Sequence, residues 1–119
     1  MGVTIDLFRN EAETVPFEEG EVIFREGDPG EAMYVVVEGK VELRIRDKVV
    51  EKVGPGGVIG EMALIDRAPR VATATALTDC RLAAIPEKRF LFMVQQTPHF
   101  SLQILRVVVE RLRRMDEKL

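Results

Sequence analysis

The feature that most constrains the fold is a series of short, strand-like segments, separated from one another by glycines, between Val15 and about Pro86. The clearest is residues 41–46, VELRIR, where apolar and charged residues alternate with the period of a half-buried strand. Other segments of this kind are residues 33–38, 71–77 and 80–85. Many short strands joined by glycine turns favour a sandwich or a barrel-like roll over about residues 15–86.

Two tight turns can be placed between these strands. Asp47-Lys48 is predicted to form the tip of a hairpin before Val49 and Val50. Gly39 can turn the chain out of the strand at residues 33–38, because glycine adopts conformations that other residues avoid.

The last third of the sequence has helical patterning. Pro86 suits a first helical turn and predicts a short helix over residues 87–96. Thr97-Pro98 repeats such a start signal, and no helix-breaking residue follows, which predicts a long helix over residues 98–118. A further short helix is predicted in the opening segment, up to about Asn10.

An apolar stripe runs along the predicted long helix. Its members recur at the 3-4-3-4 spacing of a coiled-coil seam and are Leu105, Val108, Leu112, Met115 and Leu119. The stripe could join two chains as a homodimer, or it could fold back on the roll within a monomer. Both alternatives stay open, because isolated helices of this length are marginal.

Length and composition bound the class of protein. With 119 residues and 46% hydrophobic content, residues 1–119 are expected to form a single domain whose core needs neither a disulfide nor a metal. Cys80 is the only cysteine, which agrees with a reducing, cytoplasmic setting. The net charge of −3 argues against a DNA-binding face, and no apolar run is long enough to span a membrane.

A glycine-rich loop followed by two charged residues is the best candidate for a ligand site. Residues 54–60, GPGGVIG, lead into a helix-prone stretch, an arrangement that presents backbone N–H groups to an anion. The planar fork of Arg70 suits a phosphate, whereas Glu61 would repel a phosphate and suits sugar hydroxyls. Together these residues suggest a ribose phosphate. The alternative is that Glu61 and Arg70 form only a surface salt bridge.

Residues 60–73, GEMALIDRAPRVAT, closely resemble the phosphate-binding cassette of the cyclic-nucleotide-binding domains, which occur in kinase regulatory modules, gated channels and bacterial catabolite activators. Residues 27–36, GDPGEAMYVV, and Gly39 are similar to the glycine-pinned turns of that family. The resemblance covers about residues 15–119. It implies a mainly β fold with C-terminal helices: a β-roll (double-stranded β-helix or jelly roll), a short cassette helix and a long C-terminal helix.

The resemblance also implies a role for each cassette residue. Glu61 would accept a hydrogen bond from the ribose 2′-OH, and Arg70 would pair with the cyclic phosphate. Gly60 would let the backbone approach the ribose, and the N–H groups of Ala63 and Val71 would donate to phosphate oxygens. The implied ligand-binding set is Gly60, Glu61, Met62, Ala63, Arg70, Val71 and Ala72.

Two departures from the family pattern bear on the base. Many members that prefer cGMP have a hydroxyl residue after the arginine; this chain has Val71, which favours cAMP and leaves cGMP the weaker ligand. Met115 and Asp116 stand where the long helix of some members contacts adenine, so they are candidates to cap the base. The alternatives are seam packing for Met115 and a solvated position for Asp116. Arg111, Arg113 and Arg114 are expected to be solvated; the alternative is that one of them stacks on the purine.

The resemblance implies a regulatory module that couples nucleotide binding to movement of its C-terminal helices. The sequence shows no catalytic constellation, no metal-ligand set and no DNA-binding element such as a helix-turn-helix, and the effector protein it would act on is unknown. One alternative is a dimerisation or interaction module that does not depend on nucleotide. Another is the excised sensor domain of a larger transcription factor or channel.

Overall fold

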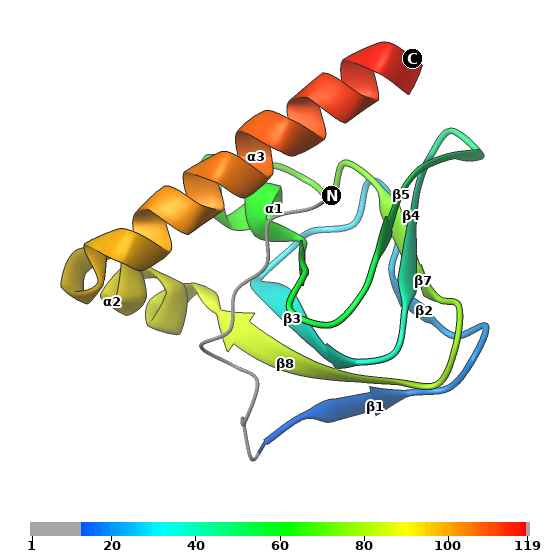
Figure 1. Cartoon of the computed structure of the whole chain (residues 1–119), viewed down its shortest axis with the longest axis horizontal. Coiled ribbons are helices and arrows are strands. Elements are labelled where there is room, and N and C mark those ends of the chain that lie inside the picture. Colours follow the sequence, from blue (N-terminus) through cyan, green and yellow to red (C-terminus); the bar gives the residue numbers. More distant parts are fainter. Residues whose placement is uncertain (1–12, 119) are drawn as a thin grey trace.

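Eight strands and three helices follow one another in the computed structural model, which describes residues 13–118 (Figure 1). The short helix predicted before Asn10 lies outside the described residues. The strands are β1 (Val15–Phe17), β2 (Val22–Phe24), β3 (Ala32–Glu38), β4 (Val41–Ile45), β5 (Lys48–Val53), β6 (Val58–Ile59), β7 (Thr73–Ala76) and β8 (Cys80–Pro86). The helices are α1 (Glu61–Asp66), α2 (Glu87–Gln96) and α3 (Pro98–Lys118).

The strands form two four-stranded sheets, and every pairing within them is antiparallel. One sheet has the order β1-β8-β3-β6 and the other the order β2-β7-β4-β5, so strands that are distant in the sequence lie side by side. The three helices lie together on one side of the strands (Figure 1). This arrangement confirms the predicted mainly β roll with C-terminal helices.

The β4–β5 hairpin differs in two details from its sequence pattern. Alternation predicts an exposed Glu42, but this residue is only 8% exposed, and its carboxylate pairs with Arg44, the next side chain on the same face. The turn lies at Arg46 and Asp47, one residue earlier than the predicted tip. Both residues have positive φ, as the common two-residue hairpin loop requires.

Two groups of buried apolar side chains form the core. The group built from β4, β5, β7 and neighbouring strands includes Val41, Leu43 and Leu82, which are at most 3% exposed. The other joins the β3–β8 pair to the helices, where the rings of Phe90 (α2) and Phe100 (α3) meet edge to face at 5.9 Å. This second group fixes the helices against the end of the roll that carries α1.

Helix α3 buries one face and exposes another. Ile104 and Val107 lie in the core, and Val108 packs against them, so the seam predicted through Val108 partly folds back on the roll. The side chain of Met115, and Leu119, lie outside the described residues. The apolar side chains that α3 leaves exposed are Leu102, Leu105, Val109 and Leu112. None of the helices within residues 13–118 is long and apolar enough to cross a membrane.

Candidate functional site

The glycine loop and α1 place the candidate ligand residues. Gly60 follows β6 directly and has φ of 80°, a left-handed conformation that favours glycine. A Cβ at Gly60 would lie 2.5 Å from Arg70 Nη1, and a Cβ at Gly30 would lie 2.7 Å from Arg70 Nε. Both glycines therefore leave room for the guanidinium of Arg70.

Arg70 is a buried cation that no carboxylate of the described residues pairs with. It is 6% exposed, and it donates to the carbonyl oxygens of Gly60 (3.1 Å) and Ala32 (2.7 Å). Its guanidinium carbon lies 4.1 Å from the centre of the Phe24 ring, and its Nε has no hydrogen-bond partner within the described part of the chain. Burial lowers the pKa of Arg70 from its ordinary value. A buried guanidinium with a free donor favours an anion as its ligand.

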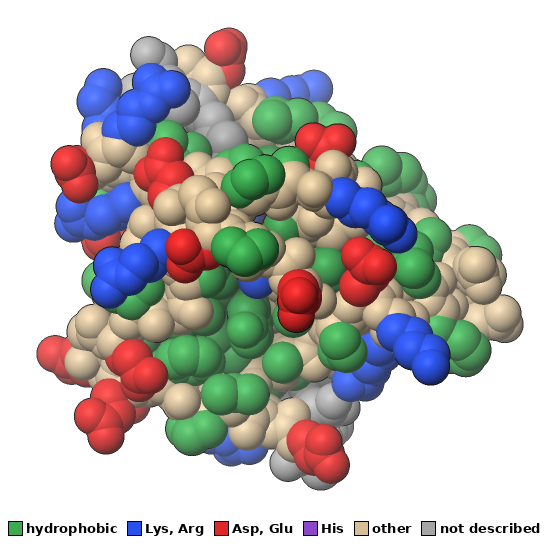
Figure 2. Space-filling view, turned by 180° about the vertical axis from the view of Figure 1, so that it is seen from behind, with side chains coloured by type: hydrophobic (Ala, Val, Ile, Leu, Met, Phe, Trp, Pro, Cys, Tyr) green, Lys and Arg blue, Asp and Glu red, His purple; other side chains and the backbone are tan. Residues whose placement is uncertain are grey.

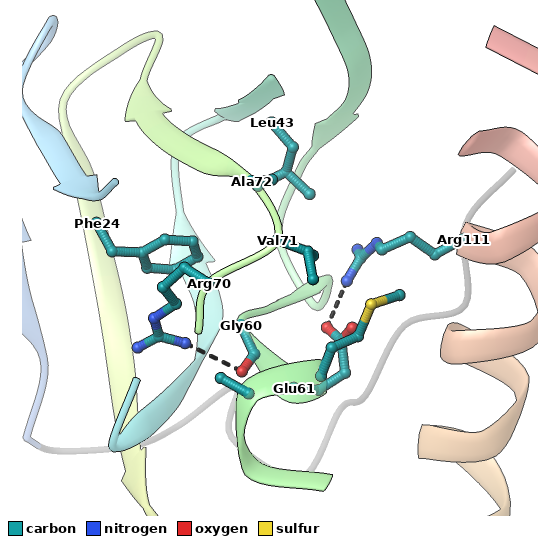
Figure 3. A pocket seen from close by; sticks show the side chains of 10 residues that line it. Phe24, Leu43, Gly60, Glu61, Arg70, Val71, Ala72 and Arg111 are labelled. Atoms are coloured by element: carbon teal, nitrogen blue, oxygen red, sulfur yellow. Dashed lines mark hydrogen bonds and ion pairs between the residues drawn. The ribbon is translucent and has the colours of Figure 1, made fainter. Parts of the chain in front are cut away.

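Glu61, the first residue of α1, is only 1% exposed and is held by the C-terminal helix. Nη1 of Arg111 on α3 donates a hydrogen bond to Glu61 Oε1. Arg111 also donates from Nε and Nη2 to the two carboxylate oxygens of Glu51 on β5, at 2.7 and 3.1 Å, and from Nη2 to the carbonyl oxygen of Val58 at 2.7 Å. We call Arg111, Glu51 and Glu61 the Arg111 cluster (Figure 3 shows its Glu61 side).

The pKa values of the two arginines are shifted in opposite directions. Burial acts to lower the pKa of Arg111, but the charges of Glu61 and Glu51, and their hydrogen bonds, raise it above the ordinary value. For Arg70, burial outweighs the charges of Tyr34, Glu61 and Asp28, which act to raise its pKa, and no ion pair joins it to a carboxylate of the described residues. The site thus has an end with a cation outside any described ion pair and an end with a carboxylate already bound to a cation.

The expectation that Arg111 is solvated is wrong, since it is 5% exposed. A signal was present in the sequence: Arg111 continues the buried positions Phe100, Ile104 and Val107 at the 4-3-4 spacing of one helix face. The suggestion that Glu61 and Arg70 form a surface salt bridge is also wrong, because both are buried and each has other partners.

A small cavity of about 20 Å³, room for little more than one water molecule, lies between these groups (Figure 3). This volume is far below the range for small-molecule sites, so a larger ligand requires the surrounding side chains to move apart. All seven cassette residues proposed from the sequence line it, and Phe24, Leu43 and Arg111 line it as well. Asp116 is exposed and does not line it, and the side chain of Met115 lies outside the described residues.

One face of the molecule carries charges of both signs. Basic and acidic side chains are interspersed on the face seen in Figure 2, with hydrophobic side chains exposed between them. Among the described residues, no group of three His, Cys, Asp or Glu side chains could hold a metal ion.

Comparisons with known proteins agree on one family. The family model described as a cyclic nucleotide-binding domain matches residues 14–97. The CRP-like cAMP-activated global transcriptional regulator of Mycobacterium tuberculosis is 31% identical over 120 residues, which cover 97% of this chain and 54% of that protein. The chain therefore spans about half the length of this curated relative.

Solved structures give the same result. The catabolite activator protein of Thermus thermophilus superposes with a TM-score of 0.80 at 31% identity, over 93% of this chain and 55% of that one. An EAL enzyme in its cGMP-bound form superposes with a TM-score of 0.70 at 34% identity, over 88% of this chain and 29% of that one. The same enzyme has also been solved in a cAMP-bound form.

Loss of the cation in the Arg111 cluster is expected to destabilise the fold. Arg111→Met leaves the carboxylate of Glu61 buried without its cation and leaves Glu51 with only Arg114, at 3.6 Å; removing one partner of a buried ion pair costs about 3–5 kcal/mol. Urea denaturation should show the free energy of unfolding lowered by that amount. The control is Arg113→Met on the exposed side of the same helix, which should change it by less than about 0.5 kcal/mol. Equal stability of both variants would contradict the cluster's role.

Proposed function

This chain belongs to the cyclic nucleotide-binding domain family, and on that premise we propose that it binds a cyclic nucleotide, preferably cAMP, in the pocket between Arg70 and Glu61. The observation that carries the proposal is the buried guanidinium of Arg70, which has a free Nε and no carboxylate partner among the described residues. A monoanionic cyclic phosphate supplies the charge and the acceptors that this guanidinium lacks.

The ribose is assigned to the Glu61 end of the pocket. Arg111 occupies one oxygen of the Glu61 carboxylate, and an ionised carboxylate has about four lone-pair sites for hydrogen bonds. Glu61 can therefore accept from the ribose 2′-OH while it keeps its bond to Arg111. Between the two ends, Gly60, Met62, Ala63, Val71 and Ala72 line the pocket and would supply backbone donors and apolar contact.

The preference for cAMP rests on the residues that would face the base. Val71 offers no hydroxyl to guanine, and Leu43 and Ala72 add only apolar surface to the lining. The similar EAL enzyme was solved with cGMP and with cAMP, so the fold itself does not decide between the two. Met115 and Asp116, one turn beyond Arg111 on α3, remain the proposed contacts of α3 with the base.

The proposed activity is regulatory and not catalytic. Arg111 links Glu61 to α3, so a ligand that binds Glu61 changes the contact that holds this helix. A ligand shifts such an equilibrium only by the difference in its affinity for the two positions of the helix. We place the domain, as one unit in the cytoplasm, upstream of an effector protein still to be identified. A module that works without nucleotide is the alternative.

A titration tests this function. Isothermal calorimetry on the ligand-stripped protein should show one cAMP per chain, weaker binding of cGMP, and little binding of linear 5′-AMP, which serves as the control. At a hundredfold excess over its dissociation constant, cAMP should stabilise the fold by about 2.7 kcal/mol. No heat and no thermal shift at millimolar cAMP would rule out nucleotide binding and favour the nucleotide-independent module.

Arg70→Lys is expected to weaken cAMP binding although the charge is kept. A lysine ammonium cannot donate to Gly60 and Ala32, stack on Phe24 and still present a fork to phosphate. Losing a charge-assisted hydrogen bond costs roughly 1.5–3 kcal/mol, or about 10- to 150-fold in affinity. The matched control is Arg67→Lys in the same loop, whose side chain is exposed. If both variants bind like the parent, Arg70 is not the phosphate ligand.

We also propose that two chains associate through α3. Leu102, Leu105, Val109 and Leu112 recur at the 3-4-3 spacing of a seam and are 44–59% exposed. Leu102, Leu105 and Val109 line a shallow groove that Arg106, Glu110 and Arg113 border. The bordering charges suit the solvated rim of such an interface.

Leu112→Glu should convert dimers into monomers, because it places a charge within the apolar seam. Light scattering at several protein concentrations, with and without cAMP, gives the mass of each species. The control is Phe92→Glu, which adds the same charge at an exposed apolar residue of α2 and should leave the mass unchanged. A parent protein that is monomeric in both states would contradict the seam.

A further inference from the structure

Glu51 has no part in the nucleotide contacts proposed above, yet it accepts two of the four hydrogen bonds that Arg111 makes. We infer that Glu51 is a positioning residue, which orients Arg111 so that Arg111 occupies only one oxygen of Glu61 and leaves the other to the ribose. This inference rests on the proposed function, because the ribose is the group that benefits.

The number of N–H donors on the guanidinium limits how Arg111 can contact Glu61. An arginine has five N–H donors, one on Nε and two on each of Nη1 and Nη2. Nε donates to Glu51 Oε1, and the two donors of Nη2 go to Glu51 Oε2 and to the carbonyl oxygen of Val58. Nη1 alone remains for Glu61, where it contacts Oε1. With Glu51 in place, Arg111 therefore meets Glu61 end-on and cannot grip both of its oxygens.

Burial of the cluster makes an unpaired donor on Arg111 costly. The side chains of Arg111, Glu51 and Glu61 are 6%, 10% and 1% exposed, so water has little access to a donor that loses its partner. Without the Glu51 carboxylate, Nε and Nη2 of Arg111 need new acceptors, because unpaired buried donors are costly. The carboxylate of Glu61 lies within reach. A two-point contact of Arg111 with Glu61 would then compete with the ribose hydroxyl.

The charge of Glu51 also favours the contact between Glu61 and the ribose hydroxyl. Two carboxylates share the single cation of Arg111, and Glu51 also has Nη1 of Arg114 at 3.6 Å. Neutralising Glu51 would direct the whole charge of Arg111 to Glu61. Glu51 thus keeps Glu61 a better acceptor for a neutral hydroxyl.

The experiment compares two ligands that differ only at the ribose. Dissociation constants for cAMP and 2′-deoxy-cAMP are measured by calorimetry on the parent chain, Glu51→Gln and a control, Glu42→Gln. The amide nitrogen of glutamine cannot accept, so Glu51→Gln leaves one of the two donors that face residue 51 without its partner and should weaken cAMP about 2- to 12-fold, the worth of one hydrogen bond. Binding of 2′-deoxy-cAMP should change by less than about twofold, because the hydroxyl that Glu51 protects is absent.

Glu42 is a close match to Glu51 as a control. Its side chain is 11% exposed, it lies on the adjacent strand β4, and its arginine partner, Arg44, is not on α3. Glu42→Gln removes the same charge and should leave both affinities within about twofold of the parent, because neither Glu42 nor its partner Arg44 lines the pocket or contacts Arg111. A selective loss of cAMP binding in this control would show an effect of net charge and would overturn the role of Glu51.

The outcomes distinguish a failure of the positioning role of Glu51 from a failure of nucleotide binding. Equal weakening of both ligands by Glu51→Gln, or no weakening, would overturn the positioning role and leave nucleotide binding intact. A parent chain that binds neither ligand would overturn the proposed function, and the inference with it. Should Glu51→Gln fail to fold, Glu51→Asp serves instead, because it keeps the charge but withdraws the carboxylate from Arg111, and the same selective loss of cAMP is expected.

Discussion

The contact between Arg111 and two carboxylates joins three parts of the molecule that no local pattern brings together. Arg111 comes from α3, Glu61 from the start of α1 and Glu51 from β5. All three side chains are almost fully buried, so the charge of each is stabilised by the opposite charge and the hydrogen bonds of its neighbours in the cluster. This group of charges consequently orients Glu61 and one wall of the pocket, and it adds to the apolar contacts of Phe100, Ile104 and Val107 that hold the C-terminal helix.

Arg70 supplies the opposite condition at the other end of the same pocket. Backbone carbonyls and the ring of Phe24 hold its guanidinium, and within the described residues no carboxylate balances it. The pocket therefore has a cation at one end and a hydrogen-bond acceptor at the other, with apolar side chains between them. A molecule with a phosphate and a hydroxyl a few bonds apart matches this arrangement, and a cyclic nucleotide has both.

Much of the fold could be predicted from the sequence, because strand alternation, glycine turns and helix start signals are local properties. Helices α2 and α3 begin where Pro86 and Pro98 indicate, and the cassette residues are adjacent in the chain. The contacts that could not be predicted join residues that lie far apart in the sequence. Arg111 lies 60 residues from Glu51 and 50 from Glu61, so its pairing follows from the packing of α3 and from no nearby motif. The role of Phe24 beside Arg70 was missed for the same reason.

The way in which Arg111 is held has a consequence for how α3 can move. Its four hydrogen bonds end on groups that are fixed to the roll, and each weakens steeply with small changes in distance and angle. A gradual outward bend of the helix would break them nearly together and leave three charges in an apolar surrounding. In the proposed coupling, α3 would therefore be either held by all four hydrogen bonds or released from them together, with no stable position in between.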